Sequence, residues 1–236
     1  MTAPAVSIAF FDPVRNLHGT ARSGATVLFE GRSPTALPEG PDLTQGRRGK
    51  VKARLEDRFS LELEPISEEA ELGGVAARVC RVKGEVGGQA VECLGTVSET
   101  REPPAWEELD AVRSLSVLLD EEHAVLALAR RPRGALGHGE ERVVAFLLEA
   151  GELLAVEDAR ISTVYDGEGR QRSAGLELWL PGEDFPRRGS GSAVAGSSLE
   201  LEGLTVHAAI FRWRVEGREG TGAYELMVRE ESPAAA

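Results

Sequence analysis

Residues 209–225 read AIFRWRVEGREGTGAYE, and residues 76–92 read AARVCRVKGEVGGQAVE. The two stretches carry Ala, Arg, Val, Gly, Gly and Glu at matching positions, so the second resembles a diverged copy of the first. Each alternates apolar and polar residues on both sides of a glycine-rich segment, which is typical of a β-hairpin. The chain is therefore expected to contain two similar halves, each with one such hairpin.

Symmetry about each turn predicts which residues face one another across the hairpin. It places Arg81 opposite Glu92 in the first copy and Arg214 opposite Glu225 in the second. A cross-strand ion pair of this kind stabilises a sheet by roughly 0.2–1 kcal/mol. We therefore assign a structural role to these residues, and in particular to Arg81, Glu92 and Arg214.

The same symmetry places Cys80 directly opposite Cys93, and the chain has 2 cysteines. A cross-strand disulfide is geometrically conceivable if the two Cα atoms lie close enough. In a reducing cytoplasm, two small buried thiols that face one another are the expected state. No second pair of ligands accompanies them, so they do not indicate a zinc site.

The composition restricts the partners of the chain. A formal charge of −12 argues against a nucleic-acid backbone or an anionic membrane as the main partner. The N-terminus lacks a basic segment followed by a long apolar one, and no run approaches the roughly 18 apolar residues of a membrane helix. We therefore expect a cytoplasmic protein without an integral membrane segment.

Short strands with turn residues at regular spacing predict an all-β protein of antiparallel barrels or sandwiches. We expect an N-terminal β lobe over residues 1–103 and a C-terminal β lobe over residues 104–236. At their boundary, prolines followed by acidic residues predict one short helix over residues 101–110. Residues 31–49 are expected to form a long loop, and the Gly/Ser-rich residues 181–198 a mobile one.

Motifs that bind common cofactors are incomplete. Gly189-Ser-Gly191 lacks the strand-then-helix context of a dinucleotide loop. His138-Gly-Glu140 resembles the start of a zinc-deaminase motif, but the Pro-Cys-x-x-Cys half is missing. No Gly-x-Ser-x-Gly elbow occurs in the chain. We therefore expect no cofactor and no metal.

The second hairpin carries an aromatic face that contains one imidazole and one phenol. Alternation puts these side chains on the same side of the predicted sheet. Such a face fits the lumen of a barrel that binds a hydrophobic ligand, and it fits equally an ordinary core with a polar edge. Its members are His207, Ala209, Phe211, Trp213, Val215, Tyr224, Leu226 and Val228. Phe211, Trp213 and Leu226 are the predicted ligand-binding residues.

Acid catalysis on an alkene requires a carboxylic acid held protonated in an apolar site, or a His or Tyr in that role. The candidates are Glu225, Asp166, Asp120, His207 and Tyr224, of which His207, Tyr224 and Glu225 are the predicted catalytic residues. The predicted Arg214 partner would hold Glu225 ionised. Asp166 is explained by its place in an Asp-Gly turn.

Several segments resemble the hydroxyneurosporene synthase-like superfamily, which includes carotenoid hydratase-like and AttH-type proteins. The similar segments are residues 10–19 (FFDPVRNLHG), 148–152 (LEAGE), 164–170 (VYDGEGR), 176–178 (LEL) and 213–225 (WRVEGREGTGAYE). The resemblance implies two lipocalin-like lobes, packed together, with a hydrophobic cavity. Relatives include enzymes that add water to carotenoid double bonds and fungal pericyclases that fold polyenes. The family's aromatic-Asp-His-x-Trp-Gly stretch is missing near residues 104–120, so the resemblance does not carry over the hydratase chemistry.

These observations lead to a function hypothesis with two alternatives. The first is a lipocalin-like protein that binds a large hydrophobic small molecule, an isoprenoid or a polyketide, with or without cofactor-free hydration or cyclisation of it. The alternatives are a non-catalytic carrier of the same fold and a structural β module. The sequence leaves open whether the protein is an enzyme.

Overall fold

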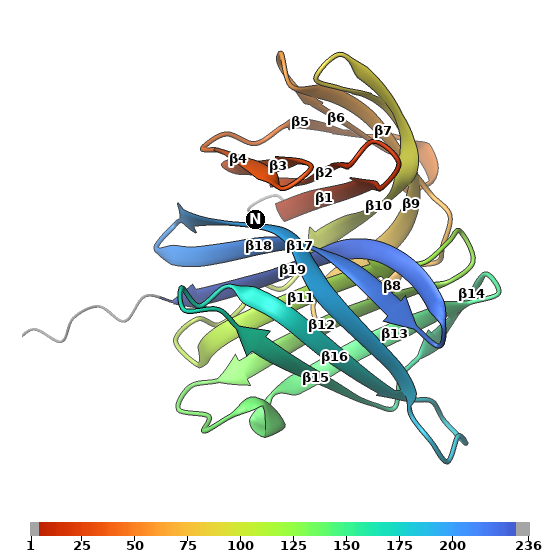
Figure 1. The fold of residues 1–236 in the computed structure, drawn as a ribbon, viewed down its shortest axis with the longest axis vertical. Coiled ribbons are helices and arrows are strands. Elements are labelled where there is room, and N and C mark those ends of the chain that lie inside the picture. The colour runs from red at the N-terminus through yellow and green to blue at the C-terminus, as the bar shows by residue number, and fades with distance from the viewer. Residues whose placement is uncertain (1–4, 230–236) are drawn as a thin grey trace, which may run out of the picture.

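The computed structural model describes residues 5–229, which form two curled antiparallel β-sheets packed against one another (Figure 1). The N-terminal sheet has ten strands in the spatial order β4-β3-β2-β1-β10-β9-β7-β6-β5, with β8 paired to β9. Its elements are β1 (Ala5–Asp12), β2 (Leu17–Arg22), β3 (Ala25–Glu30), β4 (Ser33–Leu37), β5 (Asp42–Gln45), the 3-10 turn η1 (Arg47–Gly49), β6 (Val51–Leu55), β7 (Phe59–Pro65), β8 (Ala70–Glu71), β9 (Val75–Val86) and β10 (Gln89–Thr100).

The C-terminal sheet has nine strands in the order β14-β13-β12-β11-β19-β18-β17-β16-β15. Its elements are β11 (Leu109–Leu118), β12 (Ala124–Pro132), the 3-10 turn η2 (His138–Glu140), β13 (Arg142–Glu149), β14 (Glu152–Ala155), β15 (Asp158–Tyr165), β16 (Gln171–Trp179), β17 (Arg187–Leu201), β18 (Leu204–Val215) and β19 (Arg218–Arg229).

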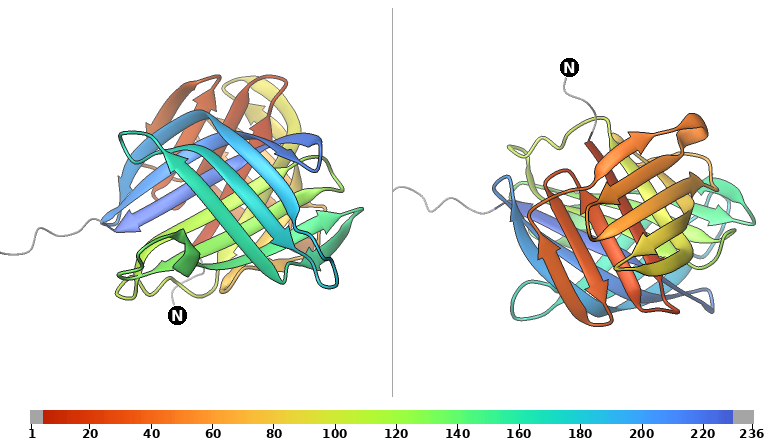
Figure 2. Two further views of the ribbon diagram at one scale, coloured as in Figure 1. Left: turned by 60° about the horizontal axis from the view of Figure 1, so that its bottom comes forward. Right: turned by 90° about the horizontal axis from the view of Figure 1, so that it is seen from above.

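The two sheets have the same strand order, which confirms the predicted duplicated all-β fold. In each sheet the first strand pairs with the last at the centre, β1 with β10 and β11 with β19. The hairpin found twice in the sequence follows in the same place, as β9–β10 and as β18–β19. Each sheet curls into a half-barrel, and we call the two half-barrels the N-terminal and C-terminal lobes. Figure 2 shows the N-terminal lobe lying over the C-terminal strands.

The turns of the repeated hairpins lie at Gly87-Gly88 and at Glu216-Gly217. All four residues have positive φ, between 47° and 82°, as a two-residue hairpin turn requires. The sequence-based prediction therefore placed each turn at the wrong position, because other glycines in the segment are equally suitable as turn residues. Those glycines instead lie within strands, where neighbouring backbone leaves no room for a side chain. A Cβ at Gly222 would lie 1.6 Å from the carbonyl oxygen of Ser116.

The displaced turns make the predicted cross-strand ion pairs wrong. Arg81 faces Leu94 and Glu92 faces Lys83, while Arg214 faces Glu219 and Glu225 faces Ala208. Cys80 and Cys93 are likewise not directly opposite, since Cys80 pairs with Gly95 and Cys93 with Val82. Both thiols are free, and burial raises the pKa of each to about 12.

The central strands of both sheets are buried on both faces, so the molecule has three cores. Along each central strand, side chains point alternately to the two faces of the sheet. Those on one face fill the interior of their own lobe, and those on the other face form a core between the lobes. On β1, Phe10 belongs to the N-terminal interior and Phe11 to the inter-lobe core. On β18, Phe211 belongs to the C-terminal interior and Ile210 to the inter-lobe core. This double burial explains continuous apolar runs where a one-sided sheet would alternate.

Three sequence-based expectations about the connections are wrong. Residues 101–108 contain no helix; they lead through a turn at 106–108 into β11, since Pro103 and Pro104 restrict their predecessors to extended backbone. Residues 31–49 contain β4 and β5, which are the two edge strands of the N-terminal sheet. The Gly/Ser-rich residues 181–198 are mostly strand β17, for a reason given below.

Within the described part of the chain, no helix has the length and apolarity needed to span a membrane.

Candidate functional site

The aromatic face predicted on the second hairpin is the packed interior of the C-terminal lobe. Phe211, Trp213 and Tyr224 are each at most 1% exposed, and Leu226 is buried beside them. The ring of Phe211 stacks on Trp213 at a centroid distance of 5.3 Å and lies 5.5 Å from the ring of Tyr224. The structure therefore places the predicted ligand-binding residues Phe211, Trp213 and Leu226 among the buried side chains of this lobe.

Glycines of β17 make room for these rings. Gly191 pairs with Trp213, and a Cβ at Gly191 would lie 2.5 Å from the indole ring. A Cβ at Gly189 would lie 3.0 Å from Val215. The Gly-Ser alternation that resembles a mobile linker is thus a strand that passes directly over a large side chain.

A buried arginine lies at the bottom of this interior, and the sequence analysis missed it. Arg113 of β11 is 1% exposed and donates from Nη1 to Thr163 Oγ1 and Tyr224 Oη, both at 2.9 Å. Its Nη2 donates to the carbonyl oxygen of Ile161 at 3.2 Å and forms an ion pair with Glu141. The signal in the sequence is one charge inside the apolar run of residues 111–118.

Tyr224 is therefore one member of a buried polar cluster. Burial raises its pKa to about 12, and its hydroxyl also lies 2.6 Å from Thr163 Oγ1. The phenol is neutral at neutral pH and its oxygen is engaged on two sides. This arrangement fits a structural role for Tyr224, in which its hydroxyl stabilises the C-terminal lobe.

His207 lies toward one end of the same interior. Its Nδ1 is 2.7 Å from the hydroxyl of Ser198, its partner across the β17–β18 ladder. Burial lowers the pKa of His207, and the nearby positive charge of Arg170 lowers it further. The imidazole is therefore neutral at neutral pH.

Glu225 points away from His207 and Tyr224, into the region between the lobes. Neighbouring residues of a strand face opposite sides, so Tyr224 and Glu225 cannot share a site. The Glu225 carboxylate forms an ion pair with the guanidinium of Arg22 on β2, and Arg22 Nη1 also donates to Met227 Sδ at 3.5 Å. Glu225 is 8% exposed. It is thus a nearly buried carboxylate whose partner comes from the other lobe.

A cavity of about 120 Å³ adjoins this ion pair, and we call it the inter-lobe cleft. Its apolar walls include Leu72, Leu126 and Leu128, while serine and threonine hydroxyls line it from both sheets. A second, smaller void of about 10 Å³ lies against the same pair and shares Thr20 with the cleft. The full lining of the inter-lobe cleft is Ser7, Ile8, Ala9, Thr20, Arg22, Leu72, Val75, Ala77, Thr96, Ser98, Thr100, Ser114, Leu115, Ser116, Leu126, Ala127, Leu128, Ala223, Glu225 and Met227.

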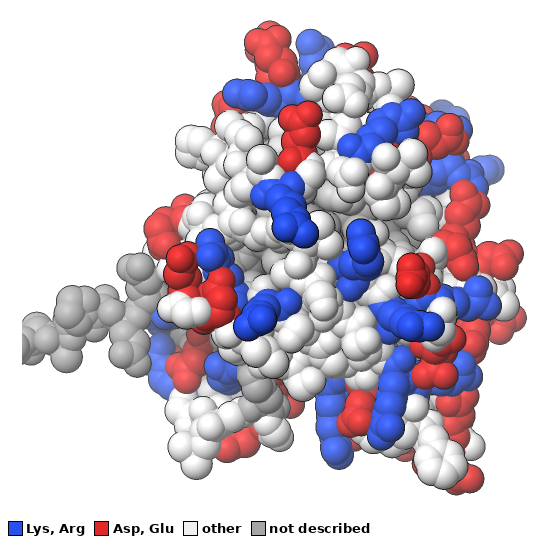
Figure 3. Space-filling view, viewed as in Figure 1, with Lys and Arg blue, Asp and Glu red and all other residues white. Residues whose placement is uncertain are grey.

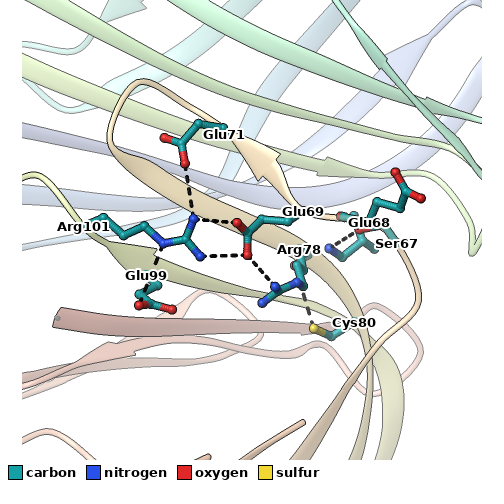
Figure 4. A network of polar contacts seen from close by, with 9 residues as sticks. Ser67, Glu68, Glu69, Glu71, Arg78, Cys80, Glu99 and Arg101 are labelled. Carbon is teal, nitrogen blue, oxygen red and sulfur yellow. Dashed lines mark hydrogen bonds and ion pairs between the residues drawn. The ribbon is translucent and has the colours of Figure 1, made fainter. Parts of the chain in front are cut away.

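One wall of the inter-lobe cleft is held by a network of charges (Figure 4). Glu69 accepts two hydrogen bonds from Arg101, at 2.6 and 3.0 Å, and also pairs with Arg78. From the other lobe, Arg130 donates to the carbonyl oxygen of Gly73. These contacts fix the position of the segment that contains Leu72, a residue of the cleft wall.

A larger depression of about 550 Å³ lies between the lobes near the opposite ends of the strands, lined by Phe11, Leu94, Leu118 and Arg212 among others. Figure 3 shows uncharged surface along the seam between the lobes on one face, bordered by basic side chains.

The three residues with a predicted structural role lie away from the cleft. Arg81 bridges the lobes by binding both carboxylate oxygens of Glu121, at 3.0 and 2.5 Å. Glu92 pairs with Lys83 at 2.8 Å. Arg214 is exposed on β18 opposite Glu219. Among the described residues, no cluster of three or more His, Cys, Asp or Glu side chains is arranged to hold a metal ion.

No protein-family model matches the chain, and no curated protein matches its sequence. Solved structures do share its fold. A protein assigned as AttH from Nitrosomonas europaea aligns over 94% of this chain and 91% of its own, with a TM-score of 0.65 and 12% identity. This chain has the same lipocalin-like, two-lobed fold.

Two further structures support that statement. Kievitone hydratase from Nectria haematococca aligns over 96% of this chain and 89% of its own, with a TM-score of 0.61 and 11% identity. CghA aligns over 96% of this chain and 88% of its own, with a TM-score of 0.61 and 10% identity. The resemblance noted in the sequence is thus confirmed for the fold.

Proposed function

We propose that this protein binds a large apolar small molecule, of the isoprenoid or polyketide class, with one end of the ligand in the inter-lobe cleft. We further propose that Glu225 takes part there in a cofactor-independent hydration or cyclisation. The observation that carries the proposal is the nearly buried Glu225 carboxylate beside a partly apolar cavity. A fold shared with kievitone hydratase supports it.

The ion pair with Arg22 decides which chemistry suits Glu225. The Glu225 carboxylate accepts from the Arg22 guanidinium in this pair, so we assign it the role of a proton acceptor. In the hydration of a polarised double bond, the oxygen of water forms a bond to one carbon while Glu225 takes a proton from that water. The carboxyl group then returns this proton to the neighbouring carbon, so that one residue serves as base and then as acid.

The apolar walls contribute by shaping the ligand. Holding a flexible polyene in one conformation lowers the entropic part of a cyclisation barrier without any proton transfer. His207 and Tyr224 lie on the other side of β18 and β19, so a reaction in this cleft proceeds without contact to either residue. Their predicted catalytic role would require a different site.

The second candidate is a carrier of the same ligand class. It is favoured by the Arg22–Glu225 pair itself, in which the guanidinium already engages the carboxylate. In an enzyme, Glu225 is needed for conversion of the ligand. In a carrier, it serves only the shape of the cleft.

Native mass spectrometry of gently purified protein tests the proposal directly. We expect a co-purifying apolar molecule whose retention falls when Thr100, at the wall of the cleft, is changed to Trp. Turnover then separates the candidates: conversion by the unchanged protein that E225Q loses, while E225Q still binds the ligand, indicates an enzyme, and a bound ligand that the unchanged protein does not convert indicates a carrier. Conversion retained by E225Q would contradict the role of Glu225. A ligand retained equally by the Thr100→Trp variant would contradict a site in this cleft.

A further inference from the structure

The inter-lobe cleft contains more hydroxyl groups than a binding site for a hydrocarbon requires. Seven side chains from both lobes contribute them: Ser7, Thr20, Thr96, Ser98, Thr100, Ser114 and Ser116. They come together because β1, β2 and β10 are neighbours in one sheet and β11 lies in the other. Ser7 pairs with Ser98, and Ser114 pairs with Glu225.

Six of these hydroxyls have no hydrogen-bond partner among the described residues, whereas that of Ser116 accepts the N–H of Ala223 at 3.2 Å. Thr20 and Thr96 are each 7% exposed, and Ser7, Ser98, Thr100 and Ser114 are partly exposed, so a ligand that fills the cleft would displace the water that reaches these hydroxyls. A hydrocarbon that filled the cleft would leave these groups without partners, which is unfavourable for binding. A ligand with its own oxygen atoms would satisfy them.

We infer that the inter-lobe cleft selects an oxygenated apolar molecule, one that carries hydroxyl or carbonyl groups along an otherwise apolar skeleton, over the corresponding hydrocarbon. This inference rests on the proposed function and narrows its ligand class. The hydroxyls of β1, β2 and β10 contact one side of the ligand, and Ser114 contacts the other. Leu72, Leu126 and Leu128 hold the apolar skeleton between them.

A matched pair of probes tests the inference by isothermal titration calorimetry. Phenol and benzene share one ring, which suits a cavity of about 120 Å³, and differ only in the hydroxyl group of phenol. We expect the intact protein to bind phenol at least about 10-fold more tightly, since a site built for hydrogen bonds rejects an analogue that lacks them. The Thr20→Val and Thr96→Val variants keep the shape of the cleft and should each reduce that preference about 3-fold or more.

Thr26→Val is the matched control, because Thr26 is a buried threonine of the same lobe whose hydroxyl lacks a partner and which does not line the cleft. It should leave the preference unchanged. The Thr100→Trp variant, which fills the cleft, should abolish binding of both probes.

The outcomes separate the inference from the proposed function. Equal or tighter binding of benzene, lost in the Thr100→Trp variant, would overturn the inference and leave an apolar ligand site in place. Failure of both probes to bind, or binding that Thr100→Trp does not affect, would overturn the proposed cleft and the inference with it.

Discussion

Arg22 and Glu225 form an ion pair that joins the two lobes, although 203 residues separate them in the chain. The side chains are 22% and 11% exposed, so both charges are partly removed from water. A lone charge in such a place is unfavourable, and each side chain depends on the other.

Changing Arg22 to Met should therefore lower the free energy of unfolding by about 1–3 kcal/mol, because Glu225 loses its partner. The double variant R22M/E225L removes both charges and should recover most of that loss. Urea unfolding of the single and double variants measures the coupling. Strictly additive effects would show that the two residues do not stabilise one another.

Gly191 should tolerate no side chain. In the Gly191→Ala variant the new Cβ would lie 2.5 Å from the Trp213 ring, which is itself buried and cannot move aside. We expect a loss of about 2–4 kcal/mol in stability, measured by chemical unfolding. Gly137→Ala is the control, since a Cβ at Gly137 has no atom within 4 Å, and it should change stability by less than about 0.5 kcal/mol.

Acid should destabilise the protein through His18. Burial lowers the pKa of His18 from 6.5 to about 4, against the opposing effect of the nearby Asp12 charge, and its Nδ1 has no hydrogen-bond partner. The unfolded chain therefore binds a proton at this residue at higher pH than the folded chain does. Stability falls as the pH falls from about 6.5 to about 4, by up to about 3 kcal/mol from this residue.

The His18→Leu variant isolates this contribution. Its stability should depend less on pH over the same interval than that of the unchanged protein, because only the titration of His18 has been removed. Urea unfolding at a series of pH values measures the difference. Parallel pH profiles would show that His18 titrates normally in the folded protein.

Tyr224 and Glu225 are neighbours with different expected roles. Tyr224→Phe removes the hydroxyl that accepts from Arg113 at 2.9 Å, and we expect a loss of about 1–2 kcal/mol in stability. Ligand binding in the inter-lobe cleft should be unchanged, because the ring faces the other side of the sheet. Glu225→Gln should change turnover or affinity, as calorimetry and product analysis would measure. A loss of conversion in Tyr224→Phe at unchanged stability would place the reaction inside the C-terminal lobe.

Local patterns predicted the duplicated all-β fold and which residues share a face. Alternation placed Phe211, Trp213 and Tyr224 together correctly, because side-chain direction depends only on parity along a strand. The register could not be predicted, because several glycines near each turn met the compositional requirement and only two adopt the turn. Strand β17 was missed because its glycines are required by Trp213, a contact that the local sequence does not contain.

The candidate site was predicted only in part. Glu225 was among the candidates, but its partner was predicted as Arg214 on the adjacent strand, whereas Arg22 comes from the opposite end of the chain. The inter-lobe cleft depends on two sheets facing each other, and no spacing within one segment encodes that. Arg113 was overlooked because a single charge in an apolar run has no periodic signature.

The pairing of first and last strands in each sheet has a consequence for how the protein is made. Ala5 pairs with Thr100, so the N-terminal sheet cannot close on the ribosome until the chain has been synthesised past residue 100. The second sheet repeats this requirement between β11 and β19. Synthesis therefore proceeds through two successive long-range strand pairings, and the inter-lobe cleft forms only when the second lobe meets the first.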